Sequence, residues 1–257
     1  MRIQTVTEYL LPLREGGSLP AVVRADDHRK YVIKFSGAGQ GVKALIADFI
    51  GGELARLSGF KTPELLLLEL DPVIAKAEPD PEIQDLLKAS AGINLGMEFI
   101  EQAATFSPNA IHVSENFASE VVWLDAFITN VDRTARNVNM LIQDESIWLI
   151  DHGASLNFHY NWRNTKNHAE NSFPLIKDHV LLKYANELNK ADKKYRELLK
   201  PTVFQNILNQ IPDAWLATSP DESPELKRQG YFDFFNHRLN MSHLFVREAV
   251  SARSQII

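Results

Sequence analysis

The stretch Asn130-Val131-Asp132-Arg133-Thr134-Ala135-Arg136-Asn137 decides the fold, together with the Asp151-His152-Gly153 triplet that follows it. Two short apolar runs, 138–142 and 146–150, lie between them and are separated by polar residues, which predicts a hairpin. An aspartate and an asparagine five positions apart therefore precede the hairpin, and a second aspartate follows it directly. Carboxylate and amide oxygens are ligands that magnesium accepts, so the pattern indicates a metal-dependent site.

The spacing within this stretch is that of nucleotide-dependent phosphoryl transfer. Asp132 and Asn137 match the aspartate and asparagine of the kinase pattern H-R-D-x-x-x-x-N, and Asp151-His152-Gly153 occupies the place of the D-F-G triplet. Asn137 and Asp151 would hold magnesium at the phosphates. Asp132 would orient the attacking hydroxyl and accept its proton. Single acidic residues in loops are usually solvated or cap helices, so this hypothesis depends on the joint pattern.

A lysine on an expected central strand fits the same chemistry. Tyr31-Val32-Ile33-Lys34-Phe35 predicts such a strand, and a buried lysine there needs a charged partner. The helix expected next offers Asp48 and Glu53, which lie five positions apart and therefore point to different sides of the helix. We favour Asp48 because it interrupts the apolar run 45–50, and Glu53 is the alternative. Lys34, at the nucleotide phosphates, and Asp48 are therefore predicted members of the catalytic set.

Two glycine segments are candidates for a phosphate-binding loop, because small residues let backbone amides approach an anion. Gly16, Gly17 and Ser18 lie between the first expected strands, and the segment 37–41 leads from the lysine strand into a helix start. Neither matches a strict GxGxxG or P-loop spacing, so both stay open.

The extended segment of Glu98, Phe99 and Ile100 is expected to form the hinge between two lobes. Its backbone amides and carbonyls would be available to an adenine edge. With the loop of Gly16, Gly17 and Ser18, this hinge completes the predicted nucleotide-binding residues.

Apolar periodicity divides the chain into a strand-rich first part and a helical remainder. Short strands are expected between residues 5 and 35, a helix at 45–57, and strands at 65–70 and 93–100. The proline-containing acidic stretch between the last two predicts a surface excursion with one helical turn. A helix is expected at 117–130, and the last helix carries an apolar stripe of Tyr231, Phe234, Phe235, Leu239, Phe245 and Ala249.

Composition excludes several classes of protein. The 27 basic and 33 acidic side chains give a net charge of −6, which disfavours binding to nucleic acid through a general positive field. The chain has no cysteine, and therefore neither disulfides nor thiolate metal sites. No stretch approaches the roughly 18 apolar residues of a membrane span, and no signal peptide is evident. We therefore expect a cytoplasmic protein without membrane or specific nucleic-acid partners.

These residues together resemble the HipA-like family of atypical kinases, over roughly residues 10 to 160. The resemblance implies a bilobal kinase-like fold, the cofactors ATP and magnesium, and phosphorylation of serine or threonine. It places Lys34 at the phosphates, Asp132 as the catalytic aspartate, and Asn137 and Asp151 at the metal. Some members are toxins of toxin–antitoxin pairs. This chain is shorter than those members and has Asp48 where such kinases commonly carry glutamate, so neither the toxin role nor an antitoxin-like operon partner is carried over.

The prediction is an α+β, bilobal protein-kinase-like fold, with an antiparallel-sheet small lobe at 1–100 and a mostly helical large lobe at 101–257. The predicted reaction transfers the γ-phosphoryl group of ATP to a hydroxyl, of a protein serine or threonine in preference to a small molecule. No A-P-E triplet follows Gly153, which leaves a pseudokinase or nucleotide-binding partner module as the alternative. Transfer of a nucleotidyl group is a third reading that uses the same metal residues.

Overall fold

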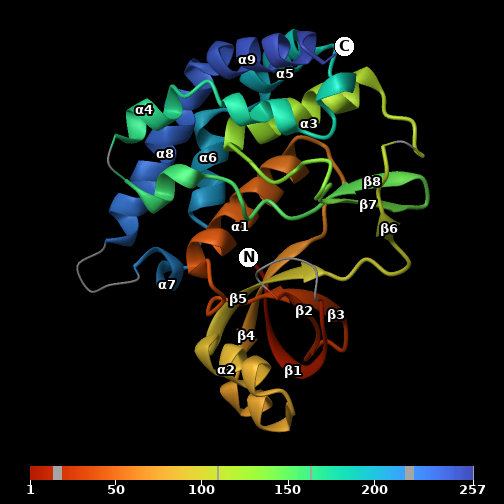
Figure 1. Cartoon of the computed structure of the whole chain (residues 1–257). Coiled ribbons are helices and arrows are strands. Elements are labelled where there is room, and N and C mark those ends of the chain that lie inside the picture. Colours follow the sequence, from red (N-terminus) through yellow and green to blue (C-terminus); the bar gives the residue numbers. More distant parts are fainter. Residues whose placement is uncertain (14–18, 109, 163, 218–222, 257) are drawn as a thin grey trace.

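The first five strands gather at one end of the molecule and most of the helices at the other, with a second, small sheet beside the helices (Figure 1). The computed structural model describes residues 1–13, 19–108, 110–162, 164–217 and 223–256. Within these ranges, none of the helices has the length and apolar character needed to cross a membrane. The predicted order of elements, strands first and helices after them, is confirmed.

Five strands form the sheet-rich part. They are β1 (Ile3–Pro12), β2 (Ala21–Ala25), β3 (Lys30–Lys34), β4 (Leu65–Leu70) and β5 (Gly92–Glu98). The strands close into a barrel in the order β1-β2-β3-β5-β4. Neighbours are antiparallel, as predicted, except that β1 and β4 pair in parallel. This parallel pairing closes the barrel, and closure leaves no open sheet edge there for unwanted strand pairing.

The side chains of β4 alternate between two apolar cores, as the period of a strand requires. Leu66 and Leu68 lie in the barrel core, where Tyr31 of β3 is also buried. Leu67 belongs to the larger core of the helical part, and so does Leu95 of β5. The outer face of these two strands therefore attaches the barrel to the rest of the molecule.

One helix of the first part, α1 (Gly41–Leu57), enters the larger core. It begins at Gly41, whose φ of +61° is a conformation that favours glycine. Further along, Gly51 lies against His152, and a Cβ atom at Gly51 would be 2.4 Å from the Cβ of His152. Glycine therefore allows α1 to lie directly against the segment that begins at Asp151.

The excursion between β4 and β5 contains more helix than the single turn expected. It forms a 3-10 helix, η1 (Pro72–Ala77), and an α-helix, α2 (Pro81–Ala89). Asp71 and Asp80 cap these helices by accepting hydrogen bonds from the N–H groups of Val73 and Glu82. Proline then occupies the first helical position, where no donor is needed. The Asp-Pro pairs are therefore helix starts, and the prediction of one turn was wrong.

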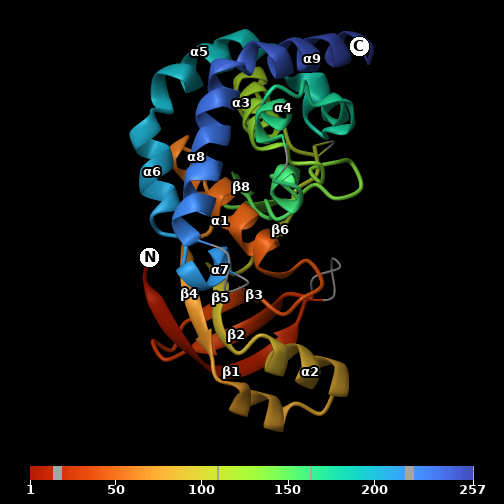
Figure 2. The same ribbon diagram turned by 90° about the vertical axis from the view of Figure 1, so that its left-hand side faces the viewer.

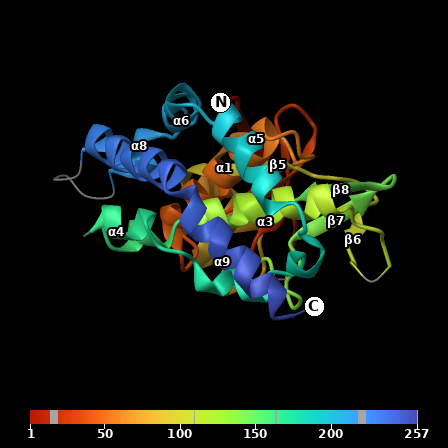
Figure 3. The same ribbon diagram turned by 90° about the horizontal axis from the view of Figure 1, so that it is seen from above.

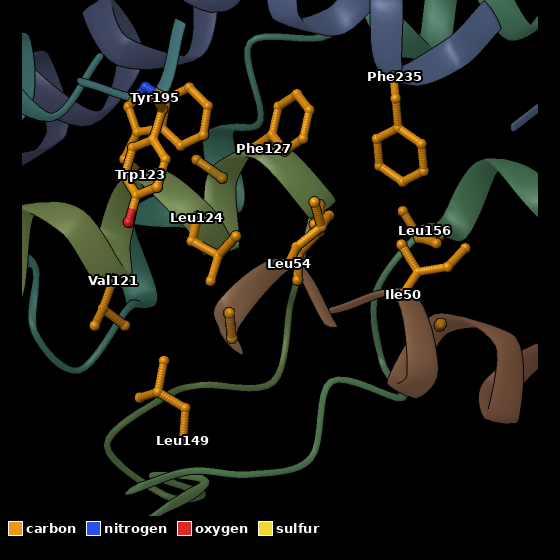
Figure 4. Close-up of a cluster of buried hydrophobic side chains, with 14 of the residues drawn as sticks. Ile50, Leu54, Val121, Trp123, Leu124, Phe127, Leu149, Leu156, Tyr195 and Phe235 are labelled. Carbon is orange, nitrogen blue, oxygen red and sulfur yellow. The ribbon is translucent and has the colours of Figure 1, made fainter. Parts of the chain in front are cut away.

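The helical part is built around α3 (Glu115–Ile128), which begins where the Ser114 hydroxyl caps the Phe117 N–H (3.2 Å). Trp123 of α3 stacks on Tyr195 with ring centroids 4.4 Å apart (Figure 4). The other elements are η2 (Asn157–Tyr160), α4 (Thr165–Ala169), η3 (Pro174–Asp178), η4 (Leu182–Tyr184), α5 (Leu188–Leu198), α6 (Pro201–Leu208) and α7 (Asp213–Leu216).

The sequence predicted one last helix that carries the whole apolar stripe. In the structure the stripe runs over two helices, so that prediction was wrong. They are α8 (Pro224–Asn240) and α9 (Ser242–Ser254), and they point in different directions (Figures 2 and 3). The chain changes direction at Met241. Both halves of the stripe are buried, with Phe235 packed on Phe127 of α3 and Phe245 on Trp123. The turn lets both halves reach the same central helix.

A small sheet lies beside the loop that begins at Asp132. It contains β6 (Ala104–Thr105), β7 (Met140–Gln143) and β8 (Ser146–Leu149), in that order. The strands β7 and β8 form the predicted hairpin, and β6 was not predicted. Asp144 and Glu145 make its turn with φ values of 46° and 61°, the conformation that suits a two-residue hairpin loop.

Candidate functional site

A cavity of about 1010 Å³ lies where the barrel meets the helical part. Its walls come from the ends of β3 and β5, the segment 99–103 that follows β5, the loop 132–139 and the segment 150–154. Lys34, Asp132, Asn137 and Asp151 all line it. The structure therefore brings together four predicted site residues that lie far apart in the sequence.

Lys34 lies at the centre of a buried ion cluster. Its Nζ atom is 2.7 Å from Oδ1 of Asp151 and also forms an ion pair with Oδ2 of Asp48. The other oxygen of Asp48 accepts a hydrogen bond from the backbone N–H of His152 (2.7 Å). Glu53, the alternative partner, pairs instead with Arg56 (2.6 Å). Of the two acidic residues considered for Lys34, Asp48 is the one in contact with it.

The charges in this cluster shift each other's ionisation. Burial disfavours the Lys34 ammonium, but Asp151 and Asp48 outweigh burial and hold its pKa above the ordinary value. Burial also opposes ionisation of Asp151, yet the charge and hydrogen bond of Lys34 lower the pKa of that carboxyl. Burial raises the pKa of Asp48, against the pull of Lys34. Asp151 is therefore the carboxylate of this cluster that stays most readily ionised.

Asp132 is held by two asparagine side chains. The Nδ2 groups of Asn137 and Asn139 donate to its Oδ2 atom, at 2.7 and 3.3 Å. Its own backbone N–H donates to Oδ1 of Asn130 (3.0 Å). Sequence reasoning missed Asn139, whose position within an apolar run gave no signal. The amide nitrogen of Asn137 is used by Asp132, so its oxygen is the group left to face a cation.

A second buried ion pair supports the loop. Arg133 Nε donates to Oδ2 of Asp125 on α3 (2.6 Å), and the same oxygen lies 2.9 Å from Nε2 of His179. The Arg133 guanidinium also donates to the backbone carbonyls of Asn139 and Ile150. Arg133 thus links the Asp132 loop to the residue before Asp151.

Asp125 was missed by sequence reasoning, although a signal was present. It interrupts the apolar run 121–128, as Asp48 interrupts the run 45–50. Burial opposes its ionisation, but the Arg133 charge and the His179 hydrogen bond together outweigh burial and hold the pKa of Asp125 well below its usual range. An acidic residue inside an apolar helix therefore marks a buried ion pair at both places.

The backbone of the Asp151-His152-Gly153 segment has an uncommon conformation. Asp151 has a φ of +52°, which is uncommon for a residue other than glycine. Its Oδ1 accepts from the N–H of Gly153 (3.2 Å). His152 is buried, and burial lowers the pKa of its imidazole to about 3, so it is neutral. His152 is packed in the core and hydrogen-bonded through its backbone N–H.

The expected hinge residues Glu98, Phe99 and Ile100 line the same cavity. The Glu98 N–H donates to the Glu64 carbonyl (2.9 Å) and the Phe99 N–H donates to the Lys30 carbonyl (3.3 Å). The Glu98 side chain forms an ion pair with Arg29. Among the described residues, the N–H of Ile100 has no acceptor. Ile100 is therefore the hinge residue with a free amide for a ligand.

Of the two glycine segments, Gly16, Gly17 and Ser18 lie outside the described residues. Their described neighbours Leu13 and Pro20 are joined by a backbone hydrogen bond of 2.7 Å and line the cavity. Gly41, at the start of α1, lines it as well. The choice between the two segments stays open.

The residues present fit a divalent cation. The side-chain oxygens of Asn137 and Asp151 are hard donors that line one cavity, and Asp151 is 38% exposed there. Magnesium is usually held by one or two protein oxygens, with phosphate oxygens and water completing its octahedron. These two side chains would supply the protein part of such a shell.

Comparison with solved structures shows the same fold. The Helicobacter pylori proinflammatory kinase CtkA is 11% identical, with a TM-score of 0.59 and 98% of each chain covered. The Golgi casein kinase with Mn/ADP bound is 10% identical, with a TM-score of 0.55 and 98% of this chain and 75% of that chain covered. The kinase-like bilobal fold is therefore confirmed. The predicted lobe boundary near residue 100 stays a prediction.

No curated protein matches the sequence. A family model described as HipA-like kinase matches residues 6–243. The match extends well beyond residue 160, where the motif resemblance ended. Because it spans most of the chain, the chain belongs to the HipA-like kinase family of phosphotransferases.

Proposed function

We propose that this protein is an ATP-dependent kinase that transfers the γ-phosphoryl group to a hydroxyl, of a protein serine or threonine in the first instance. The observation that carries the proposal is the convergence of two groups of residues in one cavity. The cluster of Lys34, Asp48 and Asp151 joins the two lobes, and Asp132 with Asn137 lines the same space. This arrangement can bind a triphosphate and present a base to an acceptor.

In this proposal each residue has a separate task. Lys34, held by Asp48, donates to the phosphate oxygens, and the Ile100 N–H donates to the adenine edge. Asn137 and Asp151 hold magnesium, which when bound neutralises phosphate charge and orients the γ-phosphoryl group. Asp132 accepts the proton of the acceptor hydroxyl as the new O–P bond forms, while the bond from the γ-phosphorus to the β,γ-bridging oxygen of ATP breaks and ADP leaves.

One observation favours a second candidate, a nucleotide-binding module without transfer. Asp151, a proposed metal ligand, lies 2.7 Å from Lys34. The contact occupies Oδ1 of Asp151 and places a positive charge beside the carboxylate, which opposes binding of a cation there. A protein that keeps the contact would bind ATP weakly or without the metal.

The test compares wild type, Asp132→Asn and Asp151→Asn with magnesium and ATP labelled at the α- or the γ-phosphate. We expect wild type to transfer the γ-label to a protein acceptor in a cell extract. Asp132→Asn should lose transfer by about 10²-fold or more while its thermal shift with ATP is kept. Asp151→Asn should lose both transfer and the magnesium-dependent part of the shift.

Three outcomes contradict the proposal. Transfer of the α-label would indicate a nucleotidyltransferase. A thermal shift with ATP but no transfer would favour the module. Equal turnover of wild type and Asp132→Asn would remove Asp132 from the role of base.

A further inference from the structure

A second cavity, of about 740 Å³, adjoins the first across the loop that carries Asp132 and Asn137. Its walls are the segment 105–108, the loop and strand 135–141, and the segment 178–183. The two cavities share Arg136, Asn137, Asn139, Leu141 and Ile150 as lining residues. Asn137, which contacts Asp132 at 2.7 Å, therefore stands at the boundary between them.

The charged residues of the second cavity are mostly basic. Arg136 and Lys183 are exposed, and Asp178 is the acidic residue of the lining. The Lys183 Nζ lies 4.7 Å from the centre of the Tyr184 ring, which holds its position. Within the described parts of the chain, neither Arg136 nor Lys183 forms an ion pair with a carboxylate. Both cations are therefore available to an anionic ligand.

A sheet edge runs into the same cavity. Thr105 of β6 lines it, and β6 is the outermost strand of the small sheet, bonded on one side to β7. An extended polypeptide can add to such an edge through its backbone. The apolar side chains of Phe106 and Met140 line the cavity as well and are almost fully buried. Edge, apolar lining and cations together suit an extended peptide better than a small alcohol.

We propose that the second cavity binds the acceptor as an extended protein segment in which acidic residues flank the hydroxyl residue. Arg136 and Lys183 bind the acidic side chains, and the shared wall at Asn137 directs the hydroxyl to Asp132. This proposal rests on the proposed kinase function and names the substrate class of that site.

The test uses the full chain with magnesium, γ-labelled ATP and short serine peptides whose flanking residues are glutamate, glutamine or lysine. We expect the lowest KM for the glutamate peptide and the highest for the lysine peptide. Lys183→Glu should raise the KM for the glutamate peptide about tenfold, with kcat changed less than about twofold. The preference should weaken at high salt, because exposed charges are screened.

Lys177→Glu is the matched control, because Lys177 is an exposed lysine of η3 that lines neither cavity. Equal KM values for the three peptides would overturn the proposal, and so would equal effects of Lys177→Glu and Lys183→Glu. Preferred transfer to free serine or a small alcohol would also overturn it.

Failure of the kinase function gives a different result, namely no γ-label transfer to any peptide, to the protein itself or to water. Peptide binding measured by fluorescence anisotropy without ATP keeps the preference measurable in that case. Tighter binding of the glutamate peptide to wild type than to Lys183→Glu is expected. If binding depends neither on the flanking residues of the peptide nor on Lys183→Glu, the acidic-acceptor site is rejected independently of the kinase function.

Discussion

Lys34 carries its charge where little water reaches it, since the residue is only 7% exposed. An unpaired ammonium at such a position would be strongly destabilising, so two carboxylates meet it. With Asp48 and Asp151 both ionised, the three groups carry one net negative charge. In the proposed function, that excess would favour a divalent cation beside Asp151, and the nucleotide phosphates would compete with Asp151 for Lys34.

Two buried histidines should make stability depend on pH. Burial lowers the pKa of His152 and of His159 from 6.5 to about 3. The unfolded chain takes up these protons below pH 6.5 while the folded chain does not, so stability is complete above pH 6.5 and falls as the pH decreases. From pH 7 to pH 5 we expect a loss of about 2 kcal/mol for each histidine in the free energy of unfolding.

Urea unfolding at the two pH values measures this loss. His159→Gln can keep a polar contact to the Tyr231 hydroxyl, which lies 2.9 Å from Nδ1 of His159. His159→Gln should remove about half of the difference in the free energy of unfolding between pH 7 and pH 5, whatever its effect on stability at pH 7. The same difference in wild type and His159→Gln would show that His159 does not titrate in this way.

At the scale of elements, the sequence predicted those that depend on local pattern. The bounds of β4 agree with the apolar run 65–70, and the hairpin agrees with two runs separated by polar residues. The break between α8 and α9 was missed because the apolar stripe continues through it. Periodicity reports which face is buried, but it does not report a change in helix direction that leaves the same face buried.

The contact of α1 with His152 gives a prediction for one element. Gly51→Ala would place a Cβ atom 2.4 Å from the Cβ of His152, so either α1 or the segment 151–153 must move. We expect a loss of about 1–3 kcal/mol in stability. Turnover should fall as well, because α1 carries Asp48 and the segment carries Asp151. Urea unfolding and kcat measure the two effects.

Gly52→Ala is the matched control on the same helix. Its Cβ atom would meet the end of the Leu65 side chain at 2.7 Å, and that side chain can rotate away. Both substitutions gain the same helix propensity of about 1 kcal/mol. Turnover unchanged in both variants would contradict a role for the α1–His152 contact in positioning the site.

At the scale of the whole molecule, the site depends on contacts that no local pattern contains. The spacing of Asp132, Asn137 and Asp151 predicted that these residues act together, because this spacing matches the kinase motif. The link from Arg133 to Asp125 and His179 joins three separate segments, so only the folded chain reveals it. The second cavity likewise combines the end of the Asp132 loop with two segments, 105–108 and 178–183, in which the sequence showed no motif.

The shared packing of the two lobes predicts that they unfold together. Leu67 and Leu95 place the outer barrel face in the core of the helical part. All four tryptophans lie outside the barrel strands, but Trp215 Nε1 donates to the Ile93 carbonyl of β5 (3.0 Å), so Trp123, Trp148 and Trp162 are the ones whose fluorescence reports on the rest of the molecule. Leu68→Ala, which empties space in the barrel core, should cost about 2–5 kcal/mol and lower the urea midpoint seen by tryptophan fluorescence.

Leu226→Ala controls for the substitution itself, because Leu226 on α8 is 76% exposed and should leave the midpoint unchanged. A lower tryptophan midpoint in Leu68→Ala alone indicates one cooperative unit, in which Lys34 and the Asp132 loop are held together by the same free energy. If the tryptophan midpoint of Leu68→Ala equals that of wild type, the barrel unfolds by itself. The cavity that contains Lys34 and Asp132 would then join two independently stable parts, and in the proposed function ATP binding would have to supply the coupling between them.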